Sequence, residues 1–386
     1  EIPLRLVGSE MCIRDRSFYV HIPYCVKRCG YCDFNTYTPA ELQISTGLTQ
    51  ISNSYIDLLI AEIDLAKAQV GDATVPTIFF GGGTPSLMEP SDIGRVIQAI
   101  DNKFGLTKDC EITLETNPDT VDKEKLAAFK TAGVNRISFG MQSAVPHVLA
   151  TLDRTHNSDN LPQVTKWATE VGFKDVSVDL IYGTPGETLA DWQTSIDAAL
   201  ALPINHISAY ALIVEEGTKL ANAIKRGEIA NVDDDLTAEK YLIADAAFSK
   251  AGFTWYELSN WSKDSGESKH NIAYWLNKNW WGAGPGAHSH LNGKRWWNVK
   301  HPNLYREKLQ QNISPELDSE VLEPIQIESE RLMLSIRLPK GITKESLSVD
   351  QIAALHQYLQ SGALDTAKWD AGSAVSYTHL TLPTKR

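Results

Sequence analysis

The chain has 386 residues, of which 42% are hydrophobic and 22% charged, so it can bury a large core in one or two domains. Its formal net charge of -12 argues against nucleic acid as a partner, because phosphate binding requires a basic surface. Only five cysteines occur and no apolar run is long enough to span a bilayer, which indicates a soluble, cytoplasmic protein in a reducing compartment.

The two ends of the chain do not fit the sequence between them. Residues 1–16 have neither the apolar segment and cleavage site of a signal peptide nor a helical or strand period, and residues 375–386 are equally unrelated to what precedes them. Both look like translations of adaptor DNA, so we expect non-native flanks and a truncated natural C-terminus. Cys12 therefore carries no functional weight.

The first predicted strand, residues 18–22, is followed by three closely spaced cysteines, Cys25, Cys29 and Cys32. Thiolate is a soft ligand that selects zinc, copper(I) or an iron–sulfur cluster. A structural zinc site takes a fourth protein ligand and an ordinary four-iron cluster takes four thiolates, so a triplet leaves one position open. The spacing alone is compatible with such a cluster, with zinc completed by His21 or a remote ligand, or with three unrelated thiols.

From residue 17 onward, predicted strands alternate with predicted helices. The strands lie at residues 18–22, 77–80, 111–115, 135–139, 175–180 and 206–211. The helices lie at residues 54–70, 92–100, 123–132 and 188–200; Ser54 with Asp57, and Thr188 with Asp191, resemble capping boxes, and Gly133 ends the third helix. Strands joined by helical crossovers are parallel, which predicts an α/β fold with a partial (β/α)6 barrel over residues 17–235 and a smaller C-terminal domain over residues 236–374.

Polar or glycine-rich residues follow five of these strands: residues 25–32, 81–84 and 115–117, then Gln142 with Ser143, and Asp179. In parallel α/β barrels the chemistry gathers at the carboxyl ends of the strands. Taken singly, each would be a turn glycine, a cap or a solvated charge. Five coincident strand ends favour one shared site, whereas Cys110 lies at the start of its strand and is expected to take no part.

The cysteine triplet resembles the radical S-adenosylmethionine (SAM) superfamily, in which three cysteines hold a [4Fe-4S] cluster and the open iron binds SAM. Four further segments are similar to the oxygen-independent coproporphyrinogen dehydrogenase family, in the same order along residues 17 to about 370: residues 19–23, 81–86, 135–143 and 179–186. The resemblance implies a cluster on Cys25, Cys29 and Cys32. It also implies SAM contacts from Tyr19, Gly82, Gly83, Thr84, Glu115, Gln142, Arg154 and Asp179. Glycine backbone can approach the methionine amine, carboxylates can bind ribose hydroxyls or an ammonium, and Arg154 can pair with the carboxylate.

Phe34 distinguishes two branches of that family. The decarboxylating branch carries a fourth cysteine two residues after the triplet, where this chain has Phe34. Residues 32–35 and 268–275 instead resemble the HemW-type heme chaperones, in which a His-Asn-x-x-Tyr-Trp stretch is associated with heme binding. The resemblance implies His270 as a heme ligand, with Asn271 orienting its ring and Lys269 near enough to pair with a propionate.

The region around His270 is rich in tryptophan. Seven of the ten tryptophans lie between Trp255 and Trp297, where His288 and His290 also occur. Aromatic faces suit a flat macrocycle and histidine is a common neutral ligand for heme iron, although a second aromatic core would have the same composition. We expect His288 and His290 to be ordinary hydrogen-bonded histidines.

Two functions follow from the resemblance. One is a heme chaperone that carries the cluster and SAM and passes heme to an acceptor haemoprotein, which could be a membrane-associated respiratory enzyme. The other is a radical SAM oxidoreductase acting on coproporphyrinogen III or another tetrapyrrole. Phe34 favours the chaperone, so coproporphyrinogen dehydrogenase activity is not expected, while SAM cleavage and a homodimer stay open.

Overall fold

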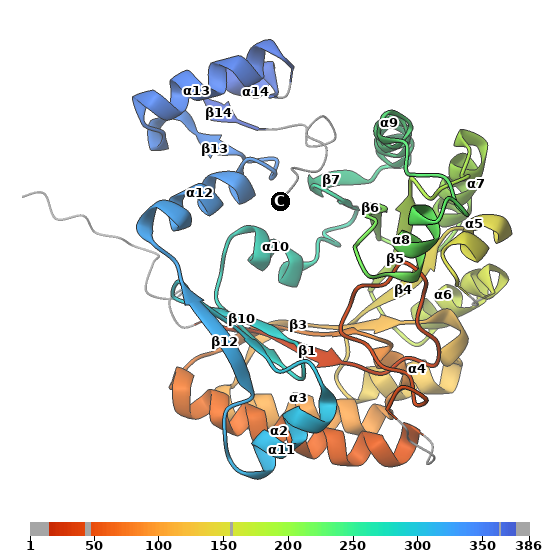
Figure 1. The fold of residues 1–386 in the computed structure, drawn as a ribbon, viewed down its shortest axis with the longest axis vertical. Coiled ribbons are helices and arrows are strands. Elements are labelled where there is room, and N and C mark those ends of the chain that lie inside the picture. The colour runs from red at the N-terminus through yellow and green to blue at the C-terminus, as the bar shows by residue number, and fades with distance from the viewer. Residues whose placement is uncertain (1–14, 43–47, 155–156, 363, 376–386) are drawn as a thin grey trace, which may run out of the picture.

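The computed structural model describes residues 15–42, 48–154, 157–362 and 364–375. Its largest feature is a twelve-stranded sheet in the order β12-β11-β10-β9-β1-β2-β3-β4-β5-β6-β8-β7 (Figure 1). The six central strands are parallel neighbours in chain order: β1 (Ser17–Ile22), β2 (Val75–Gly82), β3 (Leu106–Thr116), β4 (Arg136–Gln142), β5 (Asp175–Tyr182) and β6 (His206–Ala211). All six predicted strands are present, and five of them, all but β6, extend further than predicted at one or both ends.

Helices connect these strands and follow β6. They are α2 (Leu48–Val70), α3 (Pro90–Phe104), α4 (Lys123–Thr131), α5 (Pro146–Thr151), α6 (Leu161–Glu170), α7 (Leu189–Leu200), α8 (Lys219–Lys225) and α9 (Asp234–Lys250). Most of them pack on the outer face of the sheet through apolar side chains, while α5 and α8 contribute to a second apolar cluster near the cysteine loop. The predicted capping box at the start of α7 is confirmed, because Thr188 Oγ1 accepts from Asp191 N at 3.1 Å and Asp191 Oδ2 accepts from Thr188 N at 2.9 Å.

The predicted start of α2 at Ser54 is wrong. The helix already begins at Leu48, directly after Gly47, so Ser54 and Asp57 lie inside it. Two residues three positions apart share a helix face in any turn, and no Gly or Pro interrupts residues 48–53. The pattern therefore did not mark a terminus. The prediction also omitted α5 and α6, which connect β4 to β5.

The second half of the chain extends the same sheet at both sides. Strands β7 (Thr254–Glu257) and β8 (Asn260–Ser262) lie beyond β6; β9 (Trp280–Ala283), β10 (His288–Leu291), β11 (Lys294–Asn298) and β12 (Glu316–Val321) lie beyond β1. Between these groups, α10 (Lys269–Trp275) lies on the opposite side of the sheet from α2 and α3 (Figure 1), and α11 (Pro302–Gln310) packs against α2. The proposed boundary at residue 236 falls inside α9, and the division into two domains stays a prediction.

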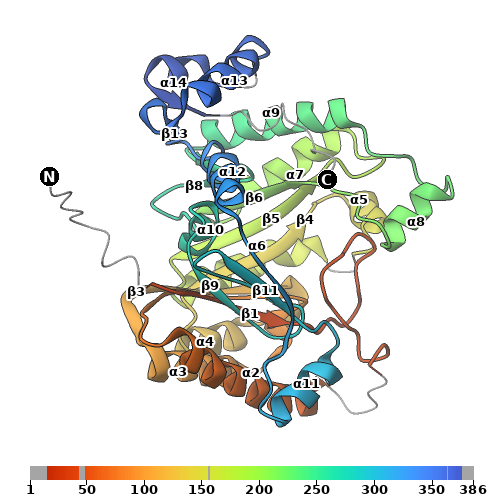
Figure 2. The same ribbon diagram turned by 60° about the vertical axis from the view of Figure 1, so that its left-hand side comes forward.

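The last described elements form a small group at one end of the molecule (Figure 2): α12 (Pro324–Ser335), β13 (Ile342–Thr343), α13 (Val349–Gln360), α14 (Thr366–Asp370) and β14 (Ser373–Ala374), with β13 paired to β14. Two residues of the proposed non-native flanks make backbone hydrogen bonds to the rest of the protein. Arg16 N donates to Thr74 O at 3.0 Å, and Val375 O accepts from Asp365 N at 2.9 Å. Residues 1–14 and 376–386, including Cys12, lie outside the described residues. Within the described ranges, no helix combines the length and apolar character that a membrane span requires.

Candidate cofactor site

In strands β3 to β6, outward apolar residues alternate with inward residues that are mostly polar. In β3, Ile112 and Leu114 are buried under the helices, while Thr113 and Glu115 face the inside of the curved sheet. The same alternation holds in β4, β5 and β6, whose inward side chains include Arg136, Ser138, Ser177, Asp179, His206 and Ser208. Because successive strand residues point to opposite faces, this pattern produces an apolar outer layer and a polar interior.

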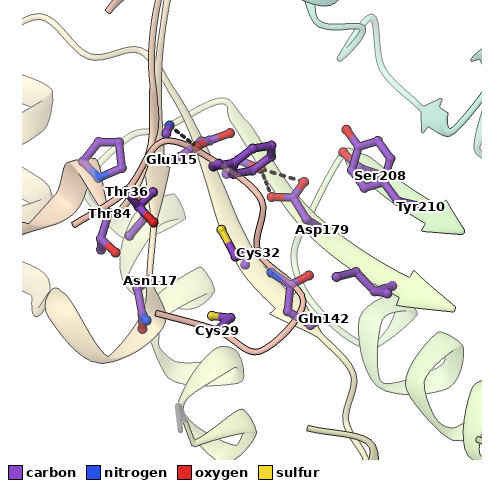
Figure 3. Close-up of a pocket in the computed structure, with 18 of the residues that line it drawn as sticks. Cys29, Cys32, Thr36, Thr84, Glu115, Asn117, Gln142, Asp179, Ser208 and Tyr210 are labelled. Carbon is purple, nitrogen blue, oxygen red and sulfur yellow. Dashed lines mark hydrogen bonds between the residues drawn. The ribbon is translucent and has the colours of Figure 1, made fainter. Parts of the chain in front are cut away.

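A cavity of about 670 Å³ occupies this interior and opens near the cysteine loop (Figure 3). That volume lies in the range of pockets that enclose a small molecule. All twelve residues predicted as ligands or contacts line it: Tyr19, Cys25, Cys29, Cys32, Gly82, Gly83, Thr84, Glu115, Gln142, Arg154, Asp179 and His270. The structure thus brings the predicted residues together, while their individual roles stay predictions.

The three triplet thiols are free and come from one loop between β1 and α2. The Cys25 thiol accepts from Thr84 Oγ1 at 3.7 Å, and the Cys29 thiol accepts from Arg154 Nη1 at 3.3 Å. Burial is the largest cause that raises the pKa of Cys32 to about 11. Thiolate ligands therefore need a compensating positive charge, which a metal centre or Arg154 can supply.

His21 is a poor fourth ligand for zinc. Its Nε2 lies 2.8 Å from Asn35 O and its Nδ1 lies 3.0 Å from Tyr19 OH, so both ring nitrogens are occupied. Across the described ranges, no three His, Cys, Asp or Glu side chains stand ready to share a metal ion. This includes the triplet itself, so a closed site for a single zinc ion is disfavoured, whereas a cluster takes one thiolate on each of three separate irons.

Two half-buried carboxyl groups, Glu115 and Asp179, form the wall beyond the cysteine loop (Figure 3). Glu115 Oε2 accepts from Gly82 N at 3.1 Å, and Asp179 accepts from Ser138 Oγ at 3.1 and 3.0 Å. Burial, followed by the charge of Asp179, raises the pKa of Glu115 to about 8, and burial also raises the pKa of Asp179. Both carboxyls would be stabilised by a cationic or hydroxyl-bearing ligand in the cavity.

Gly82 and Gly83 line the cavity, but the protein itself explains why they are glycines. A Cβ at Gly83 would lie 2.5 Å from Tyr24 O, and a Cβ at Gly82 would lie 2.5 Å from the His21 ring. Gly83 N also donates to Ile22 O at 2.7 Å, and Thr84 N donates to Tyr24 O at 2.8 Å. The end of β2 is therefore packed directly against the backbone that leads into the cysteine loop.

Arg154 does not stand in a solvent-facing position. Besides Cys29, it contacts Gly140 O through Nη2 at 3.1 Å. Nearby Gln142 has a φ of 62°, a left-handed conformation that is uncommon for a residue with a side chain. Such strain is often found at functional sites, and here it falls at the strand end where a SAM contact was predicted.

His270 is 1% exposed and lies in α10 on the cavity wall. Its Nδ1 is 2.7 Å from Thr77 Oγ1, its Nε2 is 2.9 Å from Tyr274 OH, and its ring stacks on Phe79. Burial lowers the pKa of His270 to about 3, so the imidazole is neutral, as an iron ligand must be. One of its two hydroxyl partners would have to release a ring nitrogen before iron could bind.

The neighbours of His270 have other roles than expected. Asn271 donates through Nδ2 to Glu257 Oε1 at 2.6 Å, so the ring is oriented by Thr77 and Tyr274. Lys269 pairs with Asp109 at 2.6 Å. These contacts tie α10 to β3 and β7.

The tryptophans do not form one aromatic surface. Trp261 packs with Phe248 at one side of the sheet, while Trp281 and Trp296 pack together at the other, 5.1 Å apart between ring centroids. No tryptophan is among the described residues that line the cavity. These tryptophans therefore belong to ordinary aromatic cores and not to a surface that binds a macrocycle in the cavity. His290 is hydrogen-bonded to Lys278 O at 3.2 Å, as expected, and His288 stacks on Trp297.

Several inward residues were missed by the sequence analysis, which considered only the strand ends. They are Thr113, Arg136, Ser138, Ser177, His206 and Ser208. The alternation of apolar and polar residues in the sequence could have predicted them, because parallel strands that are covered on both faces normally consist of continuous apolar residues. Polar residues at every second position predict a hollow interior.

Comparison with known proteins places this fold and site in a class. Residues 19–199 match the model of the Radical SAM superfamily, and the structure superposes on coproporphyrinogen III oxidase (HemN) from Escherichia coli with a TM-score of 0.80 at 19% identity, over 95% of this chain and 88% of that one. The fold is therefore an α/β radical SAM fold, and the class implies a [4Fe-4S] cluster and SAM.

Whole-chain relatives then define the family. The chain is 44% identical to "Heme chaperone HemW" of Mycobacterium tuberculosis over 95% of its length and 93% of that protein. It is 34% identical to the protein of the same name from Bacillus subtilis, over 94% and 95%. The chain belongs to the HemW family.

Proposed function

We propose that this protein is a heme chaperone that binds a [4Fe-4S] cluster, SAM and heme, and passes heme to haemoproteins. The observation that carries the proposal is the 44% identity, along nearly the whole chain, to relatives named heme chaperones. The acceptor could be a membrane-associated respiratory enzyme, and a second copy of the chain in a homodimer is a further proposed partner.

The proposed site assigns a role to each wall of the cavity. Cys25, Cys29 and Cys32 hold the cluster. SAM lies against Tyr19, Gly82, Gly83, Thr84, Glu115, Gln142, Arg154 and Asp179. The cluster would supply electrons and the open iron would anchor SAM, while the chain itself orients the ligands and excludes water.

His270 is the proposed heme ligand, on the α10 side of the same cavity. Its neutral imidazole supports this role, and so does its place in the His-Asn-x-x-Tyr-Trp stretch. The exposed rim near the cysteine loop adds Val26 and Phe34, which are 68% and 62% exposed and also line the cavity. Large exposed apolar side chains at a cavity mouth suit a macrocycle with an apolar face.

A radical SAM oxidoreductase acting on coproporphyrinogen III is the second candidate. The HemN-like fold is its support, but a fold hosts many functions. Phe34 opposes it, because a phenyl ring can neither donate a proton nor replace the thiol of the decarboxylating branch.

The test measures both activities on the same anaerobically reconstituted protein. We expect stable hemin binding, transfer of heme to an apo-haemoprotein, and no sustained formation of protoporphyrinogen from coproporphyrinogen. Repeated turnover of coproporphyrinogen, coupled to SAM cleavage, would replace the chaperone with the enzyme.

A further inference from the structure

The floor of the cavity, formed by inward residues near the amino ends of β4 and β6 and by the neighbouring part of β3, contains three polar atoms without partners. Nη2 of Arg136, Oγ1 of Thr113 and Nδ1 of His206 are buried and have no hydrogen-bond partner among the described residues. The three residues are 2%, 1% and 3% exposed, and all line the cavity. Since buried polar groups are almost always paired, three orphan atoms in one place require an explanation.

The three side chains are neighbours and are fixed by their other atoms. Thr113 and Arg136 are register partners across β3 and β4, and the charge of Arg136 contributes to lowering the pKa of His206, after burial. Arg136 Nη1 donates to Gly266 O at 2.9 Å, and His206 Nε2 lies 2.7 Å from Tyr256 OH. Each of the three side chains therefore has one polar atom without a hydrogen-bond partner among the described residues.

The rest of the polar interior does not share this property. Ser177 Oγ donates to Ser138 Oγ at 2.9 Å, and Ser138 in turn donates to Asp179. The hydroxyls one level above the floor thus satisfy each other and the carboxylate. One further orphan atom of the lining, Oγ1 of Thr36, lies beside the cysteine loop, so the cluster of three is a feature of the floor.

The three unpaired atoms can all donate a hydrogen bond, so a ligand at the floor should offer acceptor atoms and negative charge. Arg136 can only donate, the Thr113 hydroxyl can donate, and His206 Nδ1 donates in the tautomer whose Nε2 accepts from Tyr256. Glu111 lies 3.8 Å from Arg136 Nη1, but its oxygens accept from Ser268 Oγ, Lys269 N and His270 N at the start of α10. Arg136 is therefore a buried cation without a hydrogen-bonded carboxylate, and a carboxylate matches its donors best.

We propose that Arg136, Thr113 and His206 form a carboxylate-binding site at the floor of the cavity. Two ligands of the proposed function carry such a group: heme, through its propionates, and SAM, through its methionine moiety, for whose carboxylate Arg154 is the competing partner. The choice of probes rests on that proposed function, whereas the site itself rests on the three orphan atoms.

Thr113→Val is the sharpest test, because it keeps the shape of the side chain and removes only a hydroxyl that has no partner. Its matched control is Thr184→Val, which removes another partnerless buried hydroxyl, 2% exposed, that does not line the cavity. Reconstituted protein would be titrated with SAM and decarboxylated SAM, and with hemin and hemin dimethyl ester. We expect Thr113→Val to raise the Kd of one carboxylate-bearing ligand about tenfold, with its carboxylate-free analogue and the control unchanged.

The SAM and hemin titrations show which ligand provides the carboxylate. Selective loss of SAM affinity assigns the methionine carboxylate, and selective loss of hemin affinity assigns a propionate. Arg136→Lys, which keeps the charge but not the fork of donors, should weaken the same ligand, and it serves if Thr113→Val fails to fold.

Equal affinities of parent and both variants for all four probes would overturn the site, as would equal losses for a ligand and its carboxylate-free analogue. An ordered water would then satisfy the floor. Failure of the parent to bind hemin would instead count against the proposed heme function, and the SAM arm would still decide the site.

Discussion

The triplet cysteines differ from Cys110 in the face of the fold on which they lie. Cys25, Cys29 and Cys32 line the cavity, whereas Cys110 is on the outer face of β3, in the apolar core under the helices. Burial raises the pKa of Cys110 to about 12, which keeps it a neutral thiol. What separates Cys110 from the triplet is its position, because a thiol on the outer face of β3 does not reach a ligand in the cavity.

Single Cys→Ala variants test this assignment. We expect Cys29→Ala to lose most of its iron and sulfide after anaerobic reconstitution, because three thiolates are needed for three irons. Cys110→Ala should retain the full content and serves as the control. Full loading of Cys29→Ala, or loss of the cluster in Cys110→Ala, would contradict the assignment.

His270 combines a proposed ligand with a structural role, and the two can be separated. Replacing it by alanine removes the partner of the Tyr274 hydroxyl, which costs on the order of 1–3 kcal/mol for a buried group, and leaves Thr77 Oγ1 with only its hydrogen bond to Ser17 Oγ at 2.8 Å. We therefore expect His270→Ala to lower the thermal stability whether or not heme binds. His270→Gln, which can keep both hydrogen bonds, should recover part of that stability.

Hemin titration then measures ligation directly. If His270 binds the iron, both His270→Ala and His270→Gln should show weaker binding and an altered axial absorption spectrum. His288→Ala is the control, because His288 is exposed on β10 and does not line the cavity. Parent-like spectra and affinity in all variants would make His270 an ordinary core histidine.

At the scale of elements, the turn after β2 and the cysteine loop are one packed unit. We expect Gly83→Val to lose cluster as well as SAM, because its Cβ would meet the carbonyl oxygens of Tyr24 and Ile22 at 2.5 and 2.9 Å. Backbone atoms cannot move aside as a side-chain end can, so the loop must shift. Iron and sulfide content and equilibrium SAM binding would be measured after reconstitution.

Gly94→Ala in α3 is the matched control, since its Cβ would lie 3.4 Å from Ala132, an ordinary contact. A Gly83→Val protein with a full cluster and no SAM affinity would mean that the glycine makes room for SAM and not for the loop. Unchanged binding of both would mean that the strand end tolerates the side chain.

Prediction from sequence succeeded where local patterns match the final environment. The crossover alternation gave all six parallel strands, and the strand-end residues Cys25, Glu115 and Asp179 indeed meet in one cavity. Prediction failed where tertiary contacts determine where an element begins or which residues meet. The start of α2 depends on the chain before Ser54, and the tryptophans of β7 to β11 were separated by strand order, which composition does not reveal.

At the scale of the molecule, the sheet joins the two halves of the chain. Strand β1 pairs with β2 on one side and with β9 on the other, so residues 17–22 lie between segments about 60 and 260 residues away. The floor of the cavity is likewise closed by α10, which Glu111 of β3 holds at its first turn. The proposed domains therefore share one interior, and we expect them to unfold together.

Glu62 provides a measurable link between these halves. It is 0% exposed in α2 and accepts hydrogen bonds from Gly284 N at 2.8 Å, Asn298 Nδ2 at 2.7 Å and Tyr305 OH at 2.5 Å. Burial is the largest cause that raises the pKa of Glu62 from 4.5 to about 7, while its hydrogen bonds oppose the shift. Between these values the folded protein retains a proton that the unfolded chain has released.

The unfolding free energy should therefore be largest below the unfolded pKa and fall as the pH rises toward 7, by up to about 3 kcal/mol from this group. Denaturant unfolding at pH 5.5 and pH 8 would be compared for the parent, Glu62→Gln and, as a control, the exposed Glu239→Gln. We expect Glu62→Gln, which cannot ionise, to lose less unfolding free energy over this interval than the parent and the control. Because its partners belong to the β9–β10 turn, β11 and α11, the difference should appear in the single main transition; if it appeared only in a separate transition of one half, the two halves would be independent domains.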